Sequence, residues 1–269
     1  MTSGLTVLGN VAVDSVDGAD PTPGGCPSFI GPTLLAAPGE ARVVTRVAGD
    51  DAPLFAAQFA HYPVPLTVLP AVRTNGFQLL YNGEYRRVVV DCVGDPWTTE
   101  DIDAASIDTE WVHIAPLLRE EFPVATLRHL VEAGHRISFD GQGLVREAAI
   151  GTLREDDRYD PAILPTLSIL KVAEEEAVIV AGGSLTEEHV MRLEVPEVVA
   201  TLGSVGCDIF TSQGRCHVPA ARPVFGVHTT GAGEVFAVGY AAFRASGMEP
   251  EDAASRASAE VAGMLELRR

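Results

Sequence analysis

The segment that most constrains the fold of this chain is the entry into an apolar helix near residue 230. The sequence Thr-Thr-Gly-Ala-Gly-Glu over residues 229–234 runs directly into an apolar stretch with helical spacing, so the two glycines are predicted to lie where a helix of about residues 231–245 begins. The first amides of a helix have no intrahelical acceptor, and the helix dipole adds partial positive charge there. This end of the helix is therefore a candidate anion-binding site.

The residues of this segment also indicate a type of chemistry. Gly231 and Gly233 allow a phosphate to approach the backbone, and Glu234 projects a carboxylate from the first turn. A carboxylate beside a phosphate site is typical of phosphoryl transfer to a hydroxyl, with the carboxylate taking the proton. The alternative is an ordinary loop before a helix, because short glycine motifs are common. The dinucleotide-binding fingerprint does not fit, since the next glycine, Gly239, lies too far along the chain.

Composition limits the class of protein. The 269 residues are 46% hydrophobic and contain no Pro/Ser-rich linker, so we expect a single domain over residues 1–269. A formal net charge of −18 argues against partners such as nucleic acid or an anionic membrane. No apolar run approaches the roughly 18 residues of a membrane span, and a basic signal-peptide start is not seen. The four cysteines lack the spacing of a zinc site or a disulfide framework, which favours a cytoplasmic protein.

The order of the predicted elements favours an α/β fold. Residues 111–115, 122–133 and 136–139 have the patterns of a strand, a helix and a strand, and such alternation implies a parallel sheet with right-handed crossovers. An apolar run over residues 5–13 predicts a buried strand that ends at Asp14. Open α/β sheets bind ligands at the carboxyl ends of their strands, although an Asp after a strand is often only a turn former.

A β-hairpin is predicted in the middle of the chain. Residues 77–81 and 85–91 have strand patterns, and Asn82-Gly83 between them is a strong turn signal. A two-stranded ribbon is marginally stable by itself, so we expect it to cover another part of the molecule; an ordinary edge hairpin is the alternative. An open hairpin edge permits a homodimer without requiring one.

Several of these segments resemble signatures of the ribokinase-like (PfkB) carbohydrate kinases. Residues 229–236 are similar to the C-terminal signature Asp-Thr-Thr-Gly-Ala-Gly-Asp-x-Phe, with His228 in place of the first Asp and Glu234 in place of the catalytic Asp. Gly24-Gly25 resembles the start of the N-terminal signature Gly-Gly-x-x-x-Asn, and Phe29 replaces its Asn. Residues 201–206, Thr-Leu-Gly-Ser-Val-Gly, are similar to the nucleotide loop.

The resemblance covers nearly the whole chain and implies a fold. A ribokinase-like α/β protein has a central, mostly parallel sheet flanked by helices on both faces, together with a small β lid. In this chain the lid segments are expected at about residues 14–25 and 73–95, where the predicted hairpin lies. A lid of this kind excludes water from the transferring phosphate.

Two segments are similar to the myo-inositol kinase branch in particular. One is the Gly-Gly-x-x-Ser-Phe-Ile sequence at residues 24–30, and the other is the Asp-x-Gln-Gly-x-x-Arg sequence at residues 140–146. The resemblance therefore implies an ATP-dependent, magnesium-assisted kinase whose acceptor is a small polyol, with a cyclitol such as myo-inositol favoured. A sugar or nucleoside kinase of the same family, and a catalytically weak nucleotide- or polyol-binding protein, are the alternatives.

The resemblance also assigns roles to residues. Glu234 is the expected base, and the amides around Ala232 and Gly233, after Gly231, stabilise the transferring phosphoryl group. The remaining expected contacts are acceptor binding by Asp14, Gly24, Gly25, Ser28, Gln142 and Arg146, nucleotide binding by Thr201, Gly203, Ser204 and Gly206, and assistance to the metal by Glu176.

Three of these roles have alternatives in the residues themselves. Arg146 is equally suited to a structural ion pair, and the acids at residues 174–176 also suit the start of a helix, where Ala173 replaces the family's Asn. Glu234 is one methylene longer than Asp, and misplacing a catalytic group by about 1 Å can cost on the order of 100-fold in rate. An acceptor held farther from the helix, a slow enzyme and a protein kept for binding alone are all compatible with this Glu.

Overall fold

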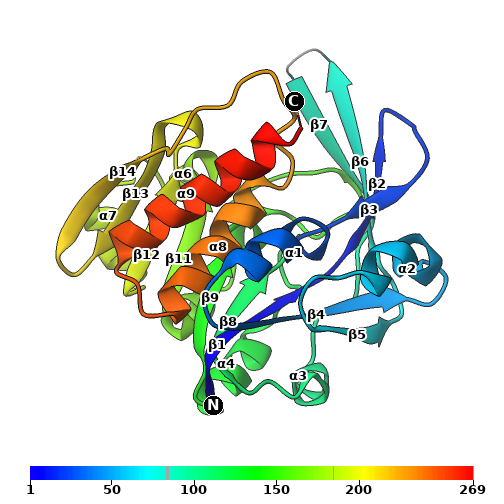
Figure 1. Cartoon of the computed structure of the whole chain (residues 1–269), viewed down its shortest axis with the longest axis horizontal. Helices are drawn as coiled ribbons and strands as arrows, with labels where there is room; N and C mark the ends of the chain where they lie inside the picture. The colour runs from blue at the N-terminus through cyan, green and yellow to red at the C-terminus, as the bar shows by residue number, and fades with distance from the viewer. Residues whose placement is uncertain (83–84, 184, 269) are drawn as a thin grey trace.

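The structure is a computed structural model that describes residues 1–82, 85–183 and 185–268, with only the backbone of Tyr85 and Arg86. In this part of the chain the strands form one large and one small sheet (Figure 1). In spatial order the large sheet contains β14 (Gly214–Pro219), β13 (Gly206–Thr211), β12 (Glu197–Thr201), β11 (Ile169–Ala173), β9 (Arg136–Asp140), β8 (Thr109–Ala115), β1 (Thr2–Gly9), β4 (Glu40–Ala48) and β5 (Leu66–Ala71).

The large sheet is mostly parallel, as the sequence predicts. All neighbouring pairs from β12 to β5 are parallel, whereas β13 and β14 add an antiparallel hairpin at one edge. Helices cover both faces (Figure 1). One face carries α1 (Pro27–Ala36), α8 (Ala232–Ala245) and α9 (Pro250–Glu266), and the other carries α3 (Thr99–Ala105), α4 (Val124–Glu132), α6 (Glu174–Ala181) and α7 (Glu187–Leu193). The expected α/β fold class is confirmed.

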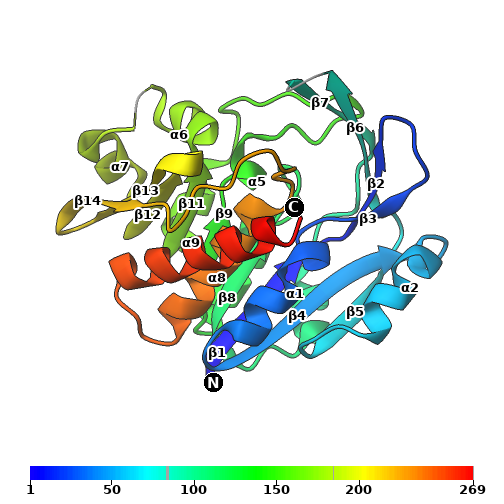
Figure 2. The same ribbon diagram turned by 45° about the horizontal axis from the view of Figure 1, so that its top comes forward.

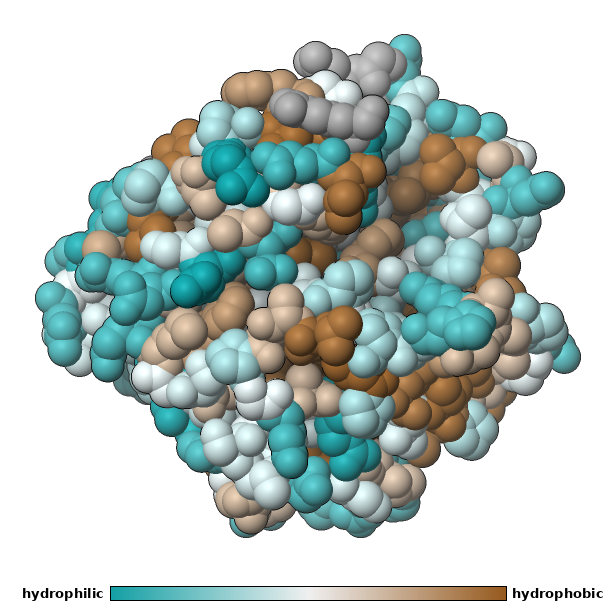
Figure 3. Space-filling model, in the orientation of Figure 1, coloured by the Kyte–Doolittle hydropathy of each residue, from teal (hydrophilic) through white to brown (hydrophobic). Residues whose placement is uncertain are grey.

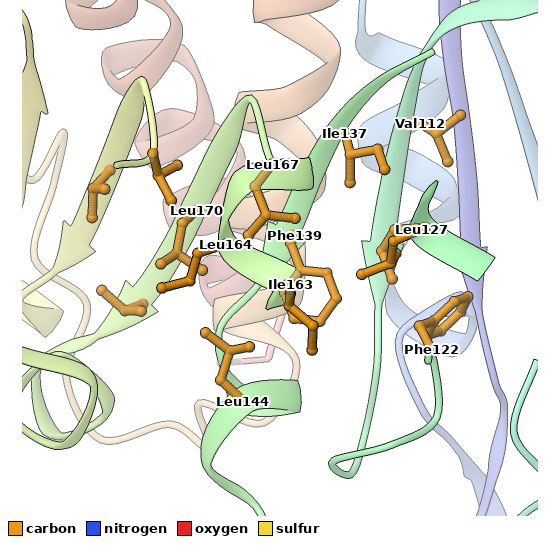
Figure 4. Close-up of a cluster of buried hydrophobic side chains, with 14 of the residues drawn as sticks. Val112, Phe122, Leu127, Ile137, Phe139, Leu144, Ile163, Leu164, Leu167 and Leu170 are labelled. Carbon is orange, nitrogen blue, oxygen red and sulfur yellow. The ribbon is translucent and has the colours of Figure 1, made fainter. Parts of the chain in front are cut away.

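The core lies in two layers, one on each face of the large sheet. Strands buried on both faces are continuous hydrophobic runs, which is why the sequence reveals them. Figure 4 shows the layer that contains Ile137 and Phe139 of β9 and Leu127 of α4. The other layer contains Val238 and Tyr240 of α8. The remaining helical segments are α2 (Ala52–Ala60), α5 (Gln142–Val145) and the short 3-10 turns Pro161–Thr166 and Gly203–Val205.

The small sheet is built from segments distant in the sequence. Its order is β10 (Gly151–Thr152), β7 (Tyr85–Cys92), β6 (Asn75–Asn82), β2 (Ala12–Val16) and β3 (Thr22–Gly24). Figure 2 shows it to one side of the carboxyl ends of the main strands, with the end of α9 across that edge. Both segments in which we expected a lid contribute strands, and β10 adds a contribution that the sequence did not indicate.

One sequence prediction about this region is wrong. The strand predicted over residues 5–13 ends at Gly9, and the chain then leaves the large sheet and forms β2 in the small one. Asp14 therefore lies within β2, not at the carboxyl end of a main strand. Because Val11 and Ala12 are as buried as the end of β1, the apolar run continues across the change of sheet. Hydrophobic periodicity alone cannot reveal such a change.

The predicted hairpin is confirmed as β6 and β7, which pair antiparallel up to Asn82 and Tyr85; Gly83 lies outside the described residues. It is not an isolated ribbon, because β6 also pairs with β2, and β7 pairs with β10 at Val89 and Val90. The open edge expected for dimerisation is therefore limited to the part of β7 that β10 leaves uncovered.

Candidate active site

Two cavities meet at the start of α8. We call the first the loop cavity: it measures about 360 Å³ and lies between the 201–206 loop, the segment after β14 and helices α8 and α9. The second, the sheet cavity, measures about 240 Å³ and lies between the small sheet and the carboxyl edge of the large sheet. Thr229 and Gly233 line both cavities, so a group held there is accessible from either side.

The backbone at the start of α8 requires glycine. Gly231 has a φ of +84°, a conformation that side chains disfavour, and an added Cβ would lie 2.7 Å from the Phe29 ring. The Ala232 amide donates to the Thr229 carbonyl at 3.0 Å, so this predicted phosphate donor is already used within the turn. The following first-turn amides, at Gly233 and Glu234, have no acceptor within a helix that begins at Ala232. These amides are the better candidates for anion binding.

Lys171 is a candidate functional residue that the sequence motifs do not include. It is the only lysine in the sequence. It lies in the middle of β11, and the residue is 5% exposed. Its Nζ lies 3.3 Å from Asp140 Oδ1, and a Cβ on Gly233 would lie 3.4 Å from the same nitrogen. A single lysine in a chain that otherwise uses arginine is the sequence signal that points to it.

Carboxylates surround the Lys171 ammonium. Burial lowers the pKa of Lys171, but Asp140, Glu176 and Glu234 offset this effect and place the pKa above its ordinary value. The side chain is therefore a fixed cation at the point where the two cavities meet. Burial also raises the pKa of the nearby Cys26 thiol, with a further contribution from Glu234, so the thiol stays neutral.

The structure separates the predicted acceptor residues near the N-terminus into two groups. Asp14 and Gly25 line the sheet cavity. Gly24 lies directly against the Asp14 carboxylate, because an added Cβ would be 2.0 Å from Asp14 Oδ2. Ser28 does not line the sheet cavity; its hydroxyl donates to the Gly24 carbonyl at 2.8 Å. Gly24 and Ser28 therefore shape the backbone near the site, while Asp14 faces the cavity.

The predicted acceptor residues after β9, together with Glu176, also line the sheet cavity. Gln142 Nε2 donates to the Pro116 carbonyl at 2.7 Å, which fixes its side chain. Arg146 Nε lies 3.5 Å from Glu155 Oε1, and the residue also borders the cavity, so the ion pair leaves the predicted site role open. Glu176 Oε2 accepts a hydrogen bond from the Ala173 amide at 2.8 Å, so one carboxylate oxygen caps α6.

The predicted nucleotide residues come together in the loop cavity, which Thr201, Gly203, Ser204 and Gly206 all line. Thr201 Oγ1 donates to the Val172 carbonyl at 3.3 Å and ties β12 to β11. Beyond this loop the wall is apolar and includes Val218, Val224, Phe236, Val261 and Leu265. The loop cavity therefore combines backbone donors at one end with a hydrophobic wall at the other.

Helix α9 and the residues just after it form hydrogen bonds and an ion pair with the segment that leads into α8. The Ala221 amide donates to Ser258 Oγ at 2.8 Å, and Arg222 forms a two-pronged ion pair with Glu266 at 3.0 and 3.2 Å. Arg268 Nη1 donates to the carbonyl of His228 at 2.8 Å and to that of Thr230 at 2.6 Å. These contacts hold the segment before α8 at Ala221 and Arg222 and again at His228 and Thr230.

The sheet cavity has one polar and one apolar wall. The large sheet, α6 and α8 supply Asp140, Lys171, Glu176 and Glu234, whereas the small sheet and the segments beside it supply the apolar Phe77, Leu79, Val88 and Leu153 together with Asp14. Figure 3 shows a hollow in the surface between the small sheet and the face of the molecule that carries α1, α8 and α9. A ligand in the sheet cavity therefore meets hydrogen-bonding groups on one side and hydrophobic groups on the other.

The arrangement is suited to holding a transferring anionic group beside a base. Helix amides and the Lys171 ammonium converge where the cavities meet, and the Glu234 carboxylate starts from the same turn. Among the described residues no cluster of three or more His, Cys, Asp or Glu side chains is arranged to hold a metal ion.

Known proteins are similar to this chain in sequence or in fold. Residues 81–265 match the profile of the pfkB family carbohydrate kinases. An inositol 3-kinase of Zea mays is 31% identical over 133 residues, which are 48% of this chain and 33% of that protein, so the match spans about a third of this relative's length.

Solved structures match over nearly the whole chain. A pyrophosphate-dependent kinase in the ribokinase family, complexed with a pyrophosphate analog and myo-inositol, superposes with a TM-score of 0.80 at 24% identity, covering 97% of this chain and 95% of that one. Arabidopsis thaliana ribokinase complexed with ribose and ATP gives a TM-score of 0.75 at 17% identity, with coverages of 100% and 94%. The chain belongs to the pfkB family of carbohydrate kinases, which are phosphotransferases that act on a hydroxyl.

Proposed function

We propose that this protein transfers the γ-phosphoryl group of ATP to a hydroxyl of a cyclitol such as myo-inositol. The observation that carries the proposal is the junction of the two cavities at Gly233, with Lys171 Nζ and the first turn of α8 beside it. The acceptor occupies the sheet cavity, and the nucleotide occupies the loop cavity. The transferring phosphoryl group passes between them at the junction.

The shape of the sheet cavity supports a small polyol as acceptor. Its volume of about 240 Å³ suits a single six-membered ring, and carboxylates such as Asp14 and Asp140 offer acceptors for several hydroxyls. The apolar wall formed by Leu79 and Val88 suits the C–H face of such a ring. The inositol-related names of the maize relative and of the first structural match favour a cyclitol over a sugar or a nucleoside.

The loop cavity bears on the choice of donor. Pyrophosphate is a second candidate, because a similar fold is described as pyrophosphate-dependent. Its high charge density needs cations, yet the one arginine among the lining residues of the loop cavity, Arg222, is paired with Glu266. The apolar wall beyond the 201–206 loop is instead suited to a nucleobase and ribose. These features favour ATP.

Magnesium fits the residues that are present. Mg²⁺ is commonly held by one or two carboxylates together with substrate phosphates and water, so it does not need an all-protein cage. Glu176 would hold it through water or directly, because only one of its oxygens is engaged by the Ala173 amide. When bound, the ion neutralises charge on the donor phosphates.

The protein residues then have separable tasks in the transfer. Glu234 takes the proton of the acceptor hydroxyl as its oxygen forms the new bond to phosphorus. The bond from phosphorus to the bridging oxygen breaks, and ADP leaves with that oxygen. Lys171 and the amides of Gly233 and Glu234 stabilise the negative charge on the phosphoryl oxygens. Asp14 and Arg146 orient the acceptor from the rim of the cavity.

A panel of donors and acceptors tests the proposal. The protein is supplied with MgATP or with magnesium pyrophosphate, each combined with inositols, pentoses, hexoses or nucleosides, and the products are identified by phosphorus NMR. We expect a cyclitol monophosphate and ADP with MgATP. Transfer from pyrophosphate alone would overturn the donor assignment, and transfer only to sugars or nucleosides would overturn the acceptor assignment. Nucleotide binding without transfer to any acceptor would indicate a binding protein.

The proposal also includes the location of the protein in the cell and its assembly state. A net charge of −18 and scattered cysteines are compatible with a cytoplasmic enzyme. A homodimer through the small sheet would have to use the uncovered part of β7 or the short edge strand β3. Sedimentation of the full chain reports its assembly state directly.

A further inference from the structure

A buried carboxylate lies where the small sheet joins the rest of the molecule. Glu121 is 2% exposed and accepts four hydrogen bonds. Asn10 Nδ2 and the Leu117 amide donate to Oε2 at 3.1 Å each, and Asn75 Nδ2 and the Leu118 amide donate to Oε1 at 2.9 and 3.2 Å. Glu121 does not line either cavity, so the proposed mechanism does not use it.

The two asparagines can donate to Glu121 in only one orientation. Asn10 Oδ1 accepts from Trp97 Nε1 at 3.0 Å, so its amide nitrogen faces Glu121. Asn75 Oδ1 accepts from the Gly94 amide at 2.8 Å, with the same consequence. An amide turned the other way would place oxygen against carboxylate and nitrogen against N–H. Each oxygen of Glu121 therefore faces two donors, an arrangement that the ionised carboxylate satisfies fully.

These contacts join the connections between the two sheets. Asn10 lies between β1 and β2, Asn75 is the first residue of β6, and Gly94 follows β7. Three of the connections between the small sheet and the rest of the chain thus meet in this network, two of them at Glu121 itself and the third through Asn75. Arg46 of β4 faces the same network, with its Nε 3.5 Å from Asn10 Oδ1 and its Nη1 2.8 Å from Asp101 Oδ2.

Glu121 is also connected to the sheet cavity. The segment whose amides it binds carries Leu118, which packs with Ala12, Phe77 and Val90 beneath the small sheet, and Leu117, which lines the cavity. The geometry points to Glu121 as a positioning residue that fixes the small sheet over the acceptor cavity. This role rests on the proposed function to the extent that the sheet cavity is the acceptor site.

The test compares Glu121→Gln with Glu120→Gln in the full chain at pH 8. Glu120 is the exposed neighbour, so the control makes the same change of charge outside the network. Glutamine keeps the size of Glu121 but turns one acceptor into a donor that faces an asparagine N–H. Hydrogen–deuterium exchange is followed in β2, β6 and β7 and, for comparison, in β8, β9 and β11, and the KM values of acceptor and donor are measured.

We expect Glu121→Gln to accelerate exchange selectively in the small sheet and to raise the acceptor KM by about tenfold, the effect of roughly one lost charge-assisted hydrogen bond. The donor KM should change by less than about twofold, because the loop cavity does not contact the small sheet. Glu120→Gln should resemble wild type. Unchanged exchange, or equal acceleration in both sheets, would overturn the proposal.

A second variant covers the case in which Glu121→Gln does not fold. Asn75→Ala removes only the donor at the start of β6 and should accelerate exchange in β6 and β7 more than in the large sheet. Exchange unchanged in this variant would also contradict the proposal. The exchange measurement does not depend on turnover, so it tests the role of Glu121 by itself. If the proposed kinase activity were wrong, the wild-type protein would transfer no phosphoryl group, and this result would be seen independently of the exchange data.

Discussion

Lys171 is the single residue on which the charge balance of the site depends. It is the only positive side chain among three carboxylates, Asp140, Glu176 and Glu234, that shift its pKa. The same ammonium lies beside Gly233, at the start of α8. The buried cation offsets repulsion among the carboxylates, and in the proposed reaction it presents positive charge to the transferring phosphoryl group.

Lys171→Met should lower kcat by about 10²- to 10³-fold, the usual cost of losing one group that stabilises transition-state charge. KM for the acceptor should change less, because the ammonium acts on the phosphoryl group. Steady-state kinetics measure both parameters. Arg128→Met, which removes an exposed cation on α4, is the control and should keep wild-type activity. A Lys171→Met variant that folds and retains more than about a tenth of wild-type kcat would contradict this role.

For single residues, the sequence reveals those that lie in contiguous motifs. It does not reveal those that are distant in the sequence and come into contact only in the folded chain. Glu234 and the glycines beside it line the sheet cavity, and Thr201, Gly203, Ser204 and Gly206 line the loop cavity, while their roles stay predictions. Lys171 and Asp140 are 31 positions apart and approach each other only because β9 and β11 are neighbours in the sheet. Ser28 falls within a predicted motif, yet its hydroxyl serves the local backbone.

Between β14 and α8 the chain forms one functional element, the segment of residues 220–231. Contacts from Ser258, Glu266 and Arg268 hold it on one side, and Phe29 of α1 lies against its last residue, Gly231. Its conformation sets where the first turn of α8 presents its amides. A small displacement here moves the phosphoryl site relative to the base, which is costly for a transfer reaction.

Two glycines of this segment form a matched pair for mutation. Gly226 has a φ of +75° with no atom within 4 Å of an added Cβ, whereas Gly231 has a φ of +84° and the Phe29 ring at 2.7 Å. Both alanine variants bear the left-handed backbone cost of about 1–2 kcal/mol. Only Gly231→Ala should also lower kcat/KM, by at least about tenfold, and adding Phe29→Ala should recover part of the loss. Equal activity of the two single variants would contradict this explanation.

Elements are also where sequence patterns and structure diverge. The βαβ alternation after residue 111 and the helix at residue 231 follow from periodicity, and both are confirmed. The break between β1 and β2 is hidden because both sides of it are buried. The two-residue strand β10 is too short for a periodic signal, and it pairs with β7 from about 60 positions away in the sequence.

For the whole molecule, the arrangement of two sheets around one edge is suited to the binding of the anionic donor that we propose for this acidic protein. The net charge of −18 repels anions at long range, so binding depends on local donors at the cavity junction. None of the helices in the described parts of the chain is long and apolar enough to cross a membrane. The small sheet lines the sheet cavity on one side of this junction, and Glu121 bonds residues at the start of this sheet and in the connection that leads to it.

The buried Glu121 should give the whole protein a pH-dependent stability. Burial raises its pKa to about 7 from 4.5, although hydrogen bonds from Leu117 and Asn75, among others, lower it. Between these two values the folded protein binds more protons than the unfolded chain, so the free energy of unfolding falls as pH rises through that window. The cost of ionising this side chain reaches about 3 kcal/mol at neutral pH, from 1.36 kcal/mol per pKa unit.

Denaturant unfolding of wild type and Glu121→Gln at pH 5 and pH 8 measures this effect. Glutamine does not titrate, so the wild-type protein should lose stability relative to the variant between the two pH values. Glu120→Gln, with the same change of charge at an exposed position, should follow wild type at both. A difference between wild type and Glu121→Gln that does not vary with pH would show that Glu121 keeps one protonation state throughout.

The central claim is that Glu234 takes the proton of an acceptor hydroxyl while the start of α8 and Lys171 hold the phosphoryl group. The most direct measurement is acceptor-dependent ADP formation from MgATP by wild type, Glu234→Gln and Glu188→Gln, the last removing a carboxylate that is 84% exposed on α7. We predict wild-type rates for Glu188→Gln and a loss of about 10²- to 10⁴-fold for Glu234→Gln, with nucleotide binding retained. Acceptor-dependent turnover unchanged in Glu234→Gln would contradict the claim.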